Sequence, residues 1–226
     1  MSPKRAILGD INSDLIQTYK EIKYRPSEVS SILRAFKEGP QAYLAVRAID
    51  PCSLSATARA ARFIYLNRFC FNGLYRTNLS GRFNVPYGGD KSGSIPSLPL
   101  LQKSSVFLKR AQLVEGDFEK TLQRVEPGDF VYLDPPFSVT GRRVFNEYNP
   151  SIFNRDDITR LRKWLEILDQ RNIHFLVSYV ESDEAEFLRN GFQSLTVLTR
   201  RNIAGFAAKR GKVNELLIYN QQSKPK

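Results

Sequence analysis

The sequence predicts an α/β protein with a mostly parallel sheet. From residue 106 onward, short runs of β-branched and aromatic residues alternate with segments of helical period. A strand-like run followed by a helical pattern also begins the chain, and a region of different character, residues 26–105, separates the two. The 226 residues, 42% hydrophobic and 25% charged, have the composition of an ordinary globular protein.

The first expected element is a strand at residues 6–9, which leads into a helix. Apolar side chains then recur at helical spacing, at Ile11, Leu15, Ile16, Tyr19 and Ile22. Asp10 lies between the two elements, where an acid can cap the helix that begins at Asn12, and Asp14 competes for that role.

Residues 26–105 are expected to form a mainly helical insertion. Helical patterns cover residues 27–38 and 54–69, and a loop or hairpin rich in Gly, Asn, Ser and Pro follows at residues 73–94. Such an insertion usually carries specificity, and the alternative is a helical cap that covers the sheet.

The second α/β part has strand patterns at residues 111–116, 129–134 and 173–180. A helix capped by Asn154 separates the last two of these, and a short helix ended by Gly191 follows. The runs SLTVLT and NELLIYN predict two final strands.

The charge balance favours a polyanionic partner. Lys and Arg number 34 against 23 Asp and Glu, which gives a net charge of +11. Residues 59–82 contain five arginines and no acidic residue, interleaved with aromatic side chains. Neutralising phosphates releases condensed counterions, so a nucleic acid is the expected partner.

Several classes of protein are not expected. No apolar run is long enough to span a membrane, and the first twenty residues lack the apolar block of a signal peptide, so we expect a cytoplasmic protein. With only Cys52, Cys70 and His174 available, neither a metal site nor Ser-His-Asp catalysis is expected.

The most informative motif is Asp134-Pro135-Pro136-Phe137, directly after a predicted strand. Ligands of open α/β sheets bind at the carboxyl ends of the strands. The Asp134 carboxylate and a carbonyl held by the rigid prolines are two acceptors suited to one NH2 group, and Phe137 can stack on a planar base. The alternative is a turn that simply ends the strand.

The motif and several further blocks resemble the Dam-type, D12 class adenine-specific DNA N6-methyltransferases. The similarity extends over nearly the whole chain, with matching blocks at residues 9–15, 61–68, 71–76, 78, 81–88, 133–137 and 209–217. It implies transfer of a methyl group from S-adenosylmethionine to N6 of a flipped adenine in double-stranded DNA. Asp134 and Pro135 would hold the N6 amino group and Phe137 would stack on the base.

The resemblance also implies roles for other residues. Asp10 would bind the hydroxyls of the cofactor ribose, a role for which Asp14 also competes, and Asp117 would approach the cofactor adenine. Arg68, Asn72 and Arg76 match family positions that contact DNA, and Lys209 and Arg210 would follow the DNA backbone or flank a hairpin. Arg59 and Arg62 are interpreted as a solvated helix face.

The family fold is a Rossmann-like sheet, here expected in residues 1–25 and 106–226, with residues 26–105 as target-recognition insertion. Family members open with a strand and a glycine-rich cofactor loop that this sequence lacks, so the first strand is expected to be missing. A second chain that supplies it is one explanation. Two alternatives remain: a non-catalytic DNA-binding or regulatory relative, and a protein that binds single-stranded RNA.

Overall fold

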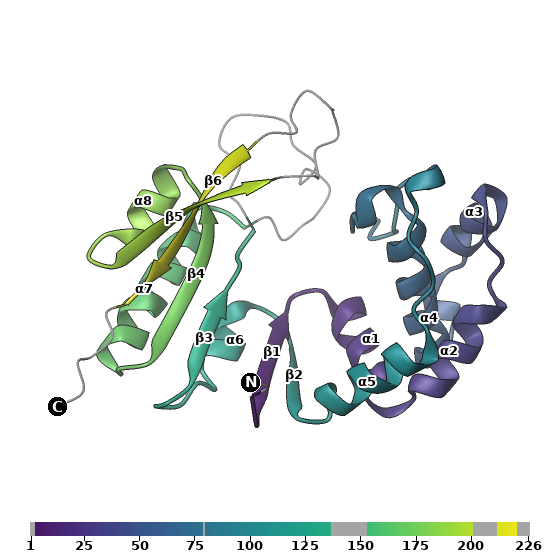
Figure 1. Cartoon of the computed structure of the whole chain (residues 1–226), viewed down its shortest axis with the longest axis horizontal. Helices are drawn as coiled ribbons and strands as arrows, with labels where there is room; N and C mark the ends of the chain where they lie inside the picture. The colour runs from purple at the N-terminus through teal and green to yellow at the C-terminus, as the bar shows by residue number, and fades with distance from the viewer. Residues whose placement is uncertain (1–2, 79, 137–152, 201–211, 221–226) are drawn as a thin grey trace. The chain divides into compact units, whose positions relative to one another are not determined.

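The computed structural model describes residues 3–78, 80–136, 153–200 and 212–220. These residues form two compact units, Met1–Gln123 (unit 1) and Arg124–Lys226 (unit 2), and each has its own sheet (Figure 1). Among the described residues, every helix is too short or too polar to cross a lipid bilayer.

Unit 1 is built on two parallel strands. β1 (Ala6–Asp10) pairs with β2 (Ala111–Glu115) from Ala6↔Ala111 to Asp10↔Glu115, so both strands end at the same edge. The short helix α6 (Phe118–Leu122) follows β2 and lies against β1. A Cβ at Gly9 would stand 1.9 Å from Thr121 Oγ1, so this close approach requires glycine.

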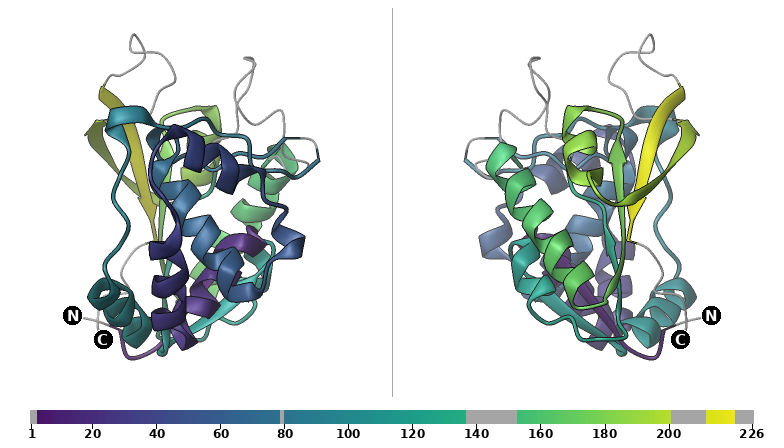
Figure 2. Two further views of the ribbon diagram at one scale, coloured as in Figure 1. Left: turned by 90° about the vertical axis from the view of Figure 1, so that its right-hand side faces the viewer. Right: turned by 90° about the vertical axis from the view of Figure 1, so that its left-hand side faces the viewer.

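Five longer helices connect the two strands. They are α1 (Ser13–Tyr24), α2 (Pro26–Ala35), α3 (Pro40–Ala48), α4 (Ala56–Phe69) and α5 (Leu98–Leu108), with single 3₁₀ turns at η1 (Pro51–Ser53), η2 (Phe71–Gly73) and η3 (Gly89–Lys91). Figure 2 shows these helices, drawn in purple to teal, from two further directions.

The predicted helix at residues 54–69 is confirmed, with Ser55 as its N-cap. The helix predicted at residues 27–38 ends earlier, at Ala35, because Gly39 (φ 105°) and Pro40 start the separate helix α3, which the sequence pattern did not reveal.

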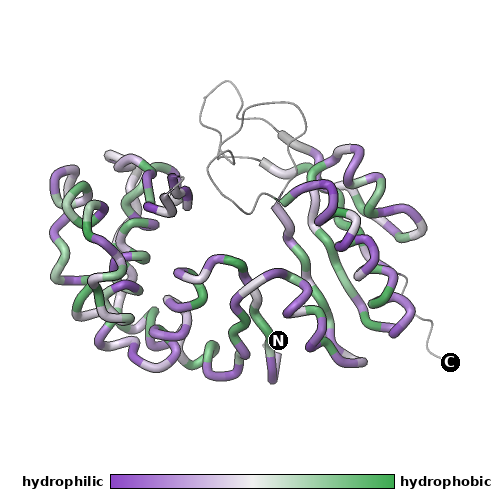
Figure 3. The backbone as a smooth tube through the Cα atoms, turned by 180° about the vertical axis from the view of Figure 1, so that it is seen from behind, coloured by the Kyte–Doolittle hydropathy of each residue, from purple (hydrophilic) through white to green (hydrophobic). Residues whose placement is uncertain are grey.

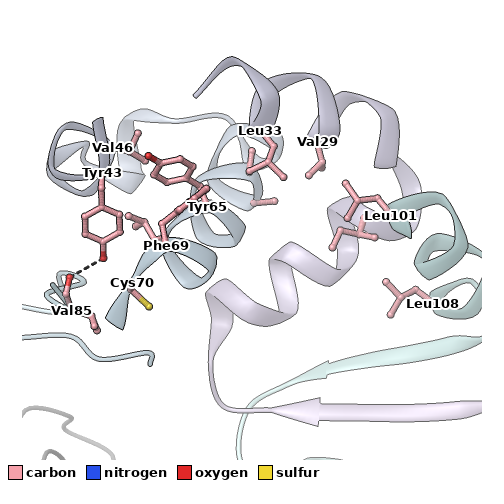
Figure 4. Close-up of a cluster of buried hydrophobic side chains, with 14 residues drawn as sticks. Val29, Leu33, Tyr43, Val46, Tyr65, Phe69, Cys70, Val85, Leu101 and Leu108 are labelled. Carbon is pink, nitrogen blue, oxygen red and sulfur yellow. Dashed lines mark hydrogen bonds between the residues drawn. The ribbon is translucent and has the colours of Figure 1, made fainter. Parts of the chain in front are cut away.

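The core of unit 1 lies among these helices and contains buried aromatic side chains (Figure 4). The hydroxyl of Tyr43 donates to the Val85 carbonyl (2.8 Å), and that of Tyr65 donates to the Lys37 carbonyl (2.7 Å). Ile22 of α1 and Leu108 of α5 belong to the same cluster. Because α1 and α5 share this core with α2 to α4, unit 1 combines the first strand pair with the expected insertion, a division other than the one the sequence suggested.

The described residues of unit 2 form a four-stranded sheet with two helices. Its strands are β3 (Phe130–Leu133), β4 (His174–Val180), β5 (Gln193–Arg200) and β6 (Lys212–Tyr219), in the order β3-β4-β6-β5. Helix α7 (Arg155–Gln170) packs on β4 and α8 (Asp183–Arg189) packs on β6. As predicted, Asn154 caps α7, in a capping box with Asp157.

The sheets are less parallel than expected. β1–β2 and β3–β4 are parallel pairs, but β6 lies antiparallel to both β4 and β5. Only residues 201–211 separate β5 from β6, and a parallel pair needs a crossover of about a dozen residues or more. β4 is hydrophobic over most of its length, whereas the helix α7 alternates between apolar and polar residues (Figure 3).

Candidate functional site

The Asp-Pro-Pro motif lies at the carboxyl end of β3, as predicted. β3 ends at Leu133, and Asp134, Pro135 and Pro136 continue without regular structure. Asp134 is exposed to solvent. Two successive prolines remove two backbone donors, so this segment presents a carboxylate and carbonyl acceptors at the sheet edge. Phe137 lies outside the described residues.

A second carboxylate, that of Glu215 in β6, contributes to the raised pKa of Asp134. Because Leu133 pairs with Val177, the chain continues past Leu133 beside Ser178 of β4. The buried hydroxyl of Ser178 donates to Glu215 Oε1, which fixes this carboxylate on the same face of the sheet. Partial burial, and then the negative charge of Glu215, raise the pKa of Asp134.

Sequence reasoning included Glu215 in a matching block but gave it no role. The alternation in the segment NELLIY places residues 215, 217 and 219 on one face of β6, which was a usable signal. It could not show which face Ser178 occupies, because that depends on the pairing register of β4 and β6.

Asp10 is the last residue of β1 and holds the start of α1. Its Oδ1 accepts a hydrogen bond from the Asn12 N–H (2.7 Å), and Asn12 in turn caps α1 by accepting from the Leu15 N–H (3.2 Å). Asn12 is therefore the N-cap, a role for which the sequence offered Asp10 and Asp14. Within the described part of the chain, Oδ2 of Asp10 makes no hydrogen bond, so one oxygen remains available to a ligand.

Asp117 lies at the same sheet edge, after β2. The Gly116 N–H donates to the Asp10 carbonyl (3.0 Å), which brings the ends of the two strands together. Asp117 caps α6 by accepting from the Glu119 N–H (3.0 Å). The structure thus brings together the two acids that were assigned to cofactor binding, although each also accepts a hydrogen bond from a nearby backbone N–H.

Arg68 is exposed in the last turn of α4. Its Nε donates to the Ser94 carbonyl (2.8 Å), and the guanidinium lies so close to Gly93 that a Cβ there would stand 2.8 Å from it. Its Nη atoms make no hydrogen bond to described residues. Arg68 is held in place with donors left to bind an external acceptor.

Asn72 has a local structural role. Asn72 (φ 55°) and Gly73 (φ 64°) are both left-handed, and the Leu74 N–H donates to the Phe71 carbonyl (3.3 Å), as in a type I′ turn. Its side-chain Nδ2 is shielded from solvent and has no partner in the described parts of the chain. In this conformation Asn72 shapes the turn, and its contact with DNA stays a prediction.

Arg76 braces the loop that follows. Its Nε donates to Asn84 Oδ1 (2.7 Å) and its Nη2 donates to the Asn84 carbonyl (3.2 Å). The Asn84 N–H returns a hydrogen bond to the Arg76 carbonyl (3.0 Å). Much of the guanidinium is therefore already engaged within the chain.

Residues 77–78 and 80–83 lie in a tight hairpin, here called the recognition hairpin. Thr77 and Phe83 make an antiparallel bridge, and Asn78 Oδ1 accepts from the N–H groups of Ser80 and Arg82 (3.1 and 2.9 Å). Arg82 is exposed, and its side chain has no partner within the described ranges. It is the hairpin arginine best placed to bind a phosphate or a base.

The interpretation of Arg59 and Arg62 as a solvated face is wrong for Arg62. This side chain is 6% exposed, and it donates from Nε to the Val46 carbonyl (3.0 Å) and from Nη2 to the Arg47 carbonyl (2.8 Å). It caps the end of α3, which the sequence had not predicted. Burial lowers its pKa. Arg59 is partly buried, with its Nε shielded and without a partner among the described residues.

Two remaining site residues, Lys209 and Arg210, lie outside the described residues. No cluster of three or more potential metal-ligating side chains occurs within the ranges that the structure describes.

Comparison with known proteins identifies the family. The sequence profile of the D12 class N6 adenine-specific DNA methyltransferases matches residues 1–203. The chain belongs to this family.

Relatives of this adenine methyltransferase support the assignment. It is 32% identical to the Type II methyltransferase M1.LlaDCHI of Lactococcus lactis subsp. cremoris, over 97% of this chain and 81% of the relative. It is 35% identical to the Type II methyltransferase M.MjaIII of Methanocaldococcus jannaschii, over 96% and 80% of the two chains. The DNA adenine methylase of Escherichia coli K12 is 32% identical, over 94% and 78%.

The family assignment confirms the resemblance and the expected activity. The protein is an adenine-specific DNA methyltransferase, an enzyme that takes a methyl group from a donor and acts on DNA. Its α/β sheets are consistent with a methyltransferase fold.

Proposed function

We propose that Asp134 and the Pro135 carbonyl hold the N6 amino group of an adenine extruded from double-stranded DNA. The observation that carries this proposal is an exposed carboxylate followed by two prolines at the carboxyl end of a parallel strand, in a chain of this family. Two acceptors that engage both N6 hydrogens direct the nitrogen lone pair out of the base plane. Phe137 is proposed to stack on the extruded base.

The methyl donor is proposed to be S-adenosylmethionine, whose sulfonium centre supplies a methyl group to a nucleophile. Asp10 fits this group because its Oδ2 accepts no hydrogen bond from the described residues. This oxygen lies at the carboxyl end of β1, where vicinal ribose hydroxyls can donate to it. Asp117 follows the neighbouring strand β2 and is proposed to bind the adenine of the donor. Because Oδ1 of Asp10 is fixed by Asn12, Oδ2 is held without rotational freedom.

DNA is proposed to bind through Arg68, the recognition hairpin, and Lys209 and Arg210, which lie outside the described residues. The positively charged stretch from residue 59 to 82 supports this, as do donors of Arg68 and Arg82 that make no hydrogen bond to the residues that the structure describes. Arg76 is proposed to act through the shape of the hairpin, with a base contact as the alternative. A cytoplasmic location follows from the DNA substrate.

The direct test is methyl transfer from labelled S-adenosylmethionine to duplex DNA, followed by nucleoside analysis. N6-methyladenine as the product supports the proposal, whereas methylcytosine or labelled RNA would contradict it. Single-stranded RNA of the same sequence serves as the control for the RNA-binding alternative.

The arginines are tested by substitution. Arg82→Ala should weaken DNA binding and lower the salt slope by about one if it contacts a phosphate, without loss of thermal stability. Arg76→Ala should weaken binding and also destabilise the hairpin, because Asn84 loses its partner. The exposed Arg34 of α2 provides the matched control, and an equal loss with Arg34→Ala would remove the hairpin from the interface.

We further propose that a Rossmann-like sheet is completed by another strand with a cofactor loop, from the same polypeptide or from a second chain. Within the described residues, β1 pairs with β2 alone and β3 pairs with β4 alone, so each has an edge that can accept a strand. Beside the β3 edge, Phe130 and Tyr132 are 66% and 58% exposed, an apolar surface that a further element can cover.

Calorimetric titration of S-adenosylmethionine tests this second proposal. The 226-residue chain should bind weakly, and a form extended by a strand and glycine-rich loop should gain cofactor binding and methylation together. Micromolar binding and full turnover by the chain as given would contradict it.

A further inference from the structure

Tyr75 connects two functional parts of unit 1 that are far apart in sequence. Its hydroxyl donates to Asp14 Oδ2 (3.3 Å), across a separation of 61 residues. Asp14 lies in the first turn of α1, while Tyr75 directly precedes the arginine that braces the recognition hairpin. This contact has no part in the roles assigned so far.

On the α1 side, the hydrogen bond reaches the segment that carries the proposed ribose ligand. Asp10 holds the Asn12 N–H, Asn12 caps the Leu15 N–H, and Asp14 lies between them in the same turn. The Asp14 carbonyl also accepts from the Thr18 hydroxyl (2.7 Å). A displacement of the Asp14 carboxylate therefore changes the position of Asp10 through these hydrogen bonds.

On the hairpin side, the Tyr75 ring is packed between aromatic residues. Its centroid lies 5.5 Å from that of Phe63 in α4 and 5.8 Å from that of Phe83, which closes the recognition hairpin. The next residue, Arg76, is bonded to Asn84 at the other end of the hairpin. Movement of the hairpin thus moves the Tyr75 hydroxyl.

We propose that Tyr75 is a positioning residue that couples DNA binding at the recognition hairpin to methyl-donor binding at Asp10, through its hydrogen bond to Asp14. The proposal rests on the proposed roles of Asp10 and of the hairpin. Binding of DNA orders the hairpin, which fixes Tyr75 and with it the first turn of α1. By thermodynamic linkage, the donor increases the affinity for DNA by the same factor.

The hydroxyl remains a donor over the whole range in which a methyltransferase is assayed. Partial burial, and then the carboxylate of Asp14, raise the pKa of Tyr75, a side chain that is 41% exposed, to about 12, so the phenol stays protonated. The hydrogen bond to Asp14 therefore persists over this pH range and does not act as a pH switch.

The test measures the affinity for a duplex with and without S-adenosylhomocysteine, and the affinity for S-adenosylhomocysteine with and without the duplex. Each ligand should improve the binding of the other by about fivefold or more in the parent, in an assembly that is active in methylation. Tyr75→Phe keeps the ring contacts and removes the hydroxyl, and it should reduce this factor to less than about twofold in both directions.

Two further variants separate coupling from a merely structural role. Tyr65→Phe removes a tyrosine hydroxyl of the unit 1 core, which donates to the Lys37 carbonyl, and should leave the coupling factor unchanged. Asp14→Ala should reproduce the loss, and its combination with Tyr75→Phe should cause no additional loss, because both remove the same contact.

The outcomes are distinguishable. A parent that binds neither ligand contradicts the proposed function and this inference with it. If both ligands bind, an absent coupling in the parent overturns this inference alone. An unchanged coupling in Tyr75→Phe, or an equal loss in Tyr65→Phe, does the same.

Discussion

Asp10 of unit 1 and Asp134 of unit 2 both lie at the carboxyl end of a parallel strand, yet their surroundings differ. One oxygen of Asp10 is bonded to the backbone of Asn12, and Gly9 beside it is packed tightly under α6. Asp134 is exposed and has no hydrogen bond to a described residue. Its pKa is raised by partial burial and then by the charge of Glu215. The comparison shows that a strand-end position does not by itself define a carboxylate's role.

The difference matches the tasks proposed for the two acids. An acid that binds a ribose needs a fixed direction, which an internal hydrogen bond provides. An acid that receives an extruded base must keep both oxygens accessible until the base arrives. The raised pKa of Asp134 is the consequence of partial burial, and then of the nearby Glu215 carboxylate.

The largest expected effect is on methyl transfer in Asp134→Ala. Removing the carboxylate leaves the N6 amino group without its orienting acceptor, so kcat should fall by roughly 10²-fold or more, while DNA affinity is retained. Methyl incorporation in a form that is active to begin with measures the change. Turnover within about tenfold of the parent would show that Asp134 is not the central acid.

The same position has an opposite effect on stability. Because the folded-state pKa of Asp134 is raised, its contribution to stability is present below the unfolded pKa and is lost as the pH rises through the folded value. Asp134→Asn should therefore have a higher Tm than the parent at neutral pH, and the difference should disappear in acid. A lower Tm at neutral pH would mean that the carboxylate stabilises the fold.

Asp10 should show a smaller effect, confined to the methyl donor. Asp10→Ala loses both the proposed ribose contact and the bond to Asn12, and KM for the donor should rise by roughly 10- to 100-fold. Asp10→Asn keeps an acceptor for the Asn12 N–H and should restore the helix start but little donor affinity. If Asn restores both, the residue acts only on the backbone.

Gly9→Ala tests the packing behind Asp10. The added Cβ would collide with Thr121 Oγ1, and displacement of α6 should lower the free energy of unfolding by about 1 to 3 kcal/mol in a denaturant titration. Thr121→Ala in the same chain removes the nearest atom and should recover part of the loss. Full stability of the single variant would show that α6 moves aside freely.

The smallest expected effect concerns the pH profile. Glu215→Gln removes a negative charge that raises the pKa of Asp134, so this pKa falls and the acid limb of kcat/KM moves to lower pH. Glu181→Gln is the matched control, since Glu181 is bonded to Asn214 and is not a cause of the Asp134 shift. Identical profiles for Glu215→Gln and the parent would remove Glu215 from the site.

Local signals in the sequence determined much of this protein. The periodicity and caps around α4 and α7, the strand before Asp134, and the positions of Asp10 and Asp117 after β1 and β2 were all predictable. These features depend on residues that are close together in the chain. The spacing of apolar residues gives the helical or strand period, and a capping side chain bonds only to backbone a few residues away. The blocks that resemble the family could also be recognised in the sequence, and they predicted the activity.

The tertiary structure decided which charged side chains are available. Arg62 and Arg76 resemble Arg68 and Arg82 in sequence, but the first two donate to backbone and side-chain oxygens of distant segments, and the last two keep donors for a partner. The same holds for the Glu215 carboxylate beside Asp134 and for the Tyr75 contact with Asp14. Burial and pairing depend on which elements pack together, and no local pattern contains that information.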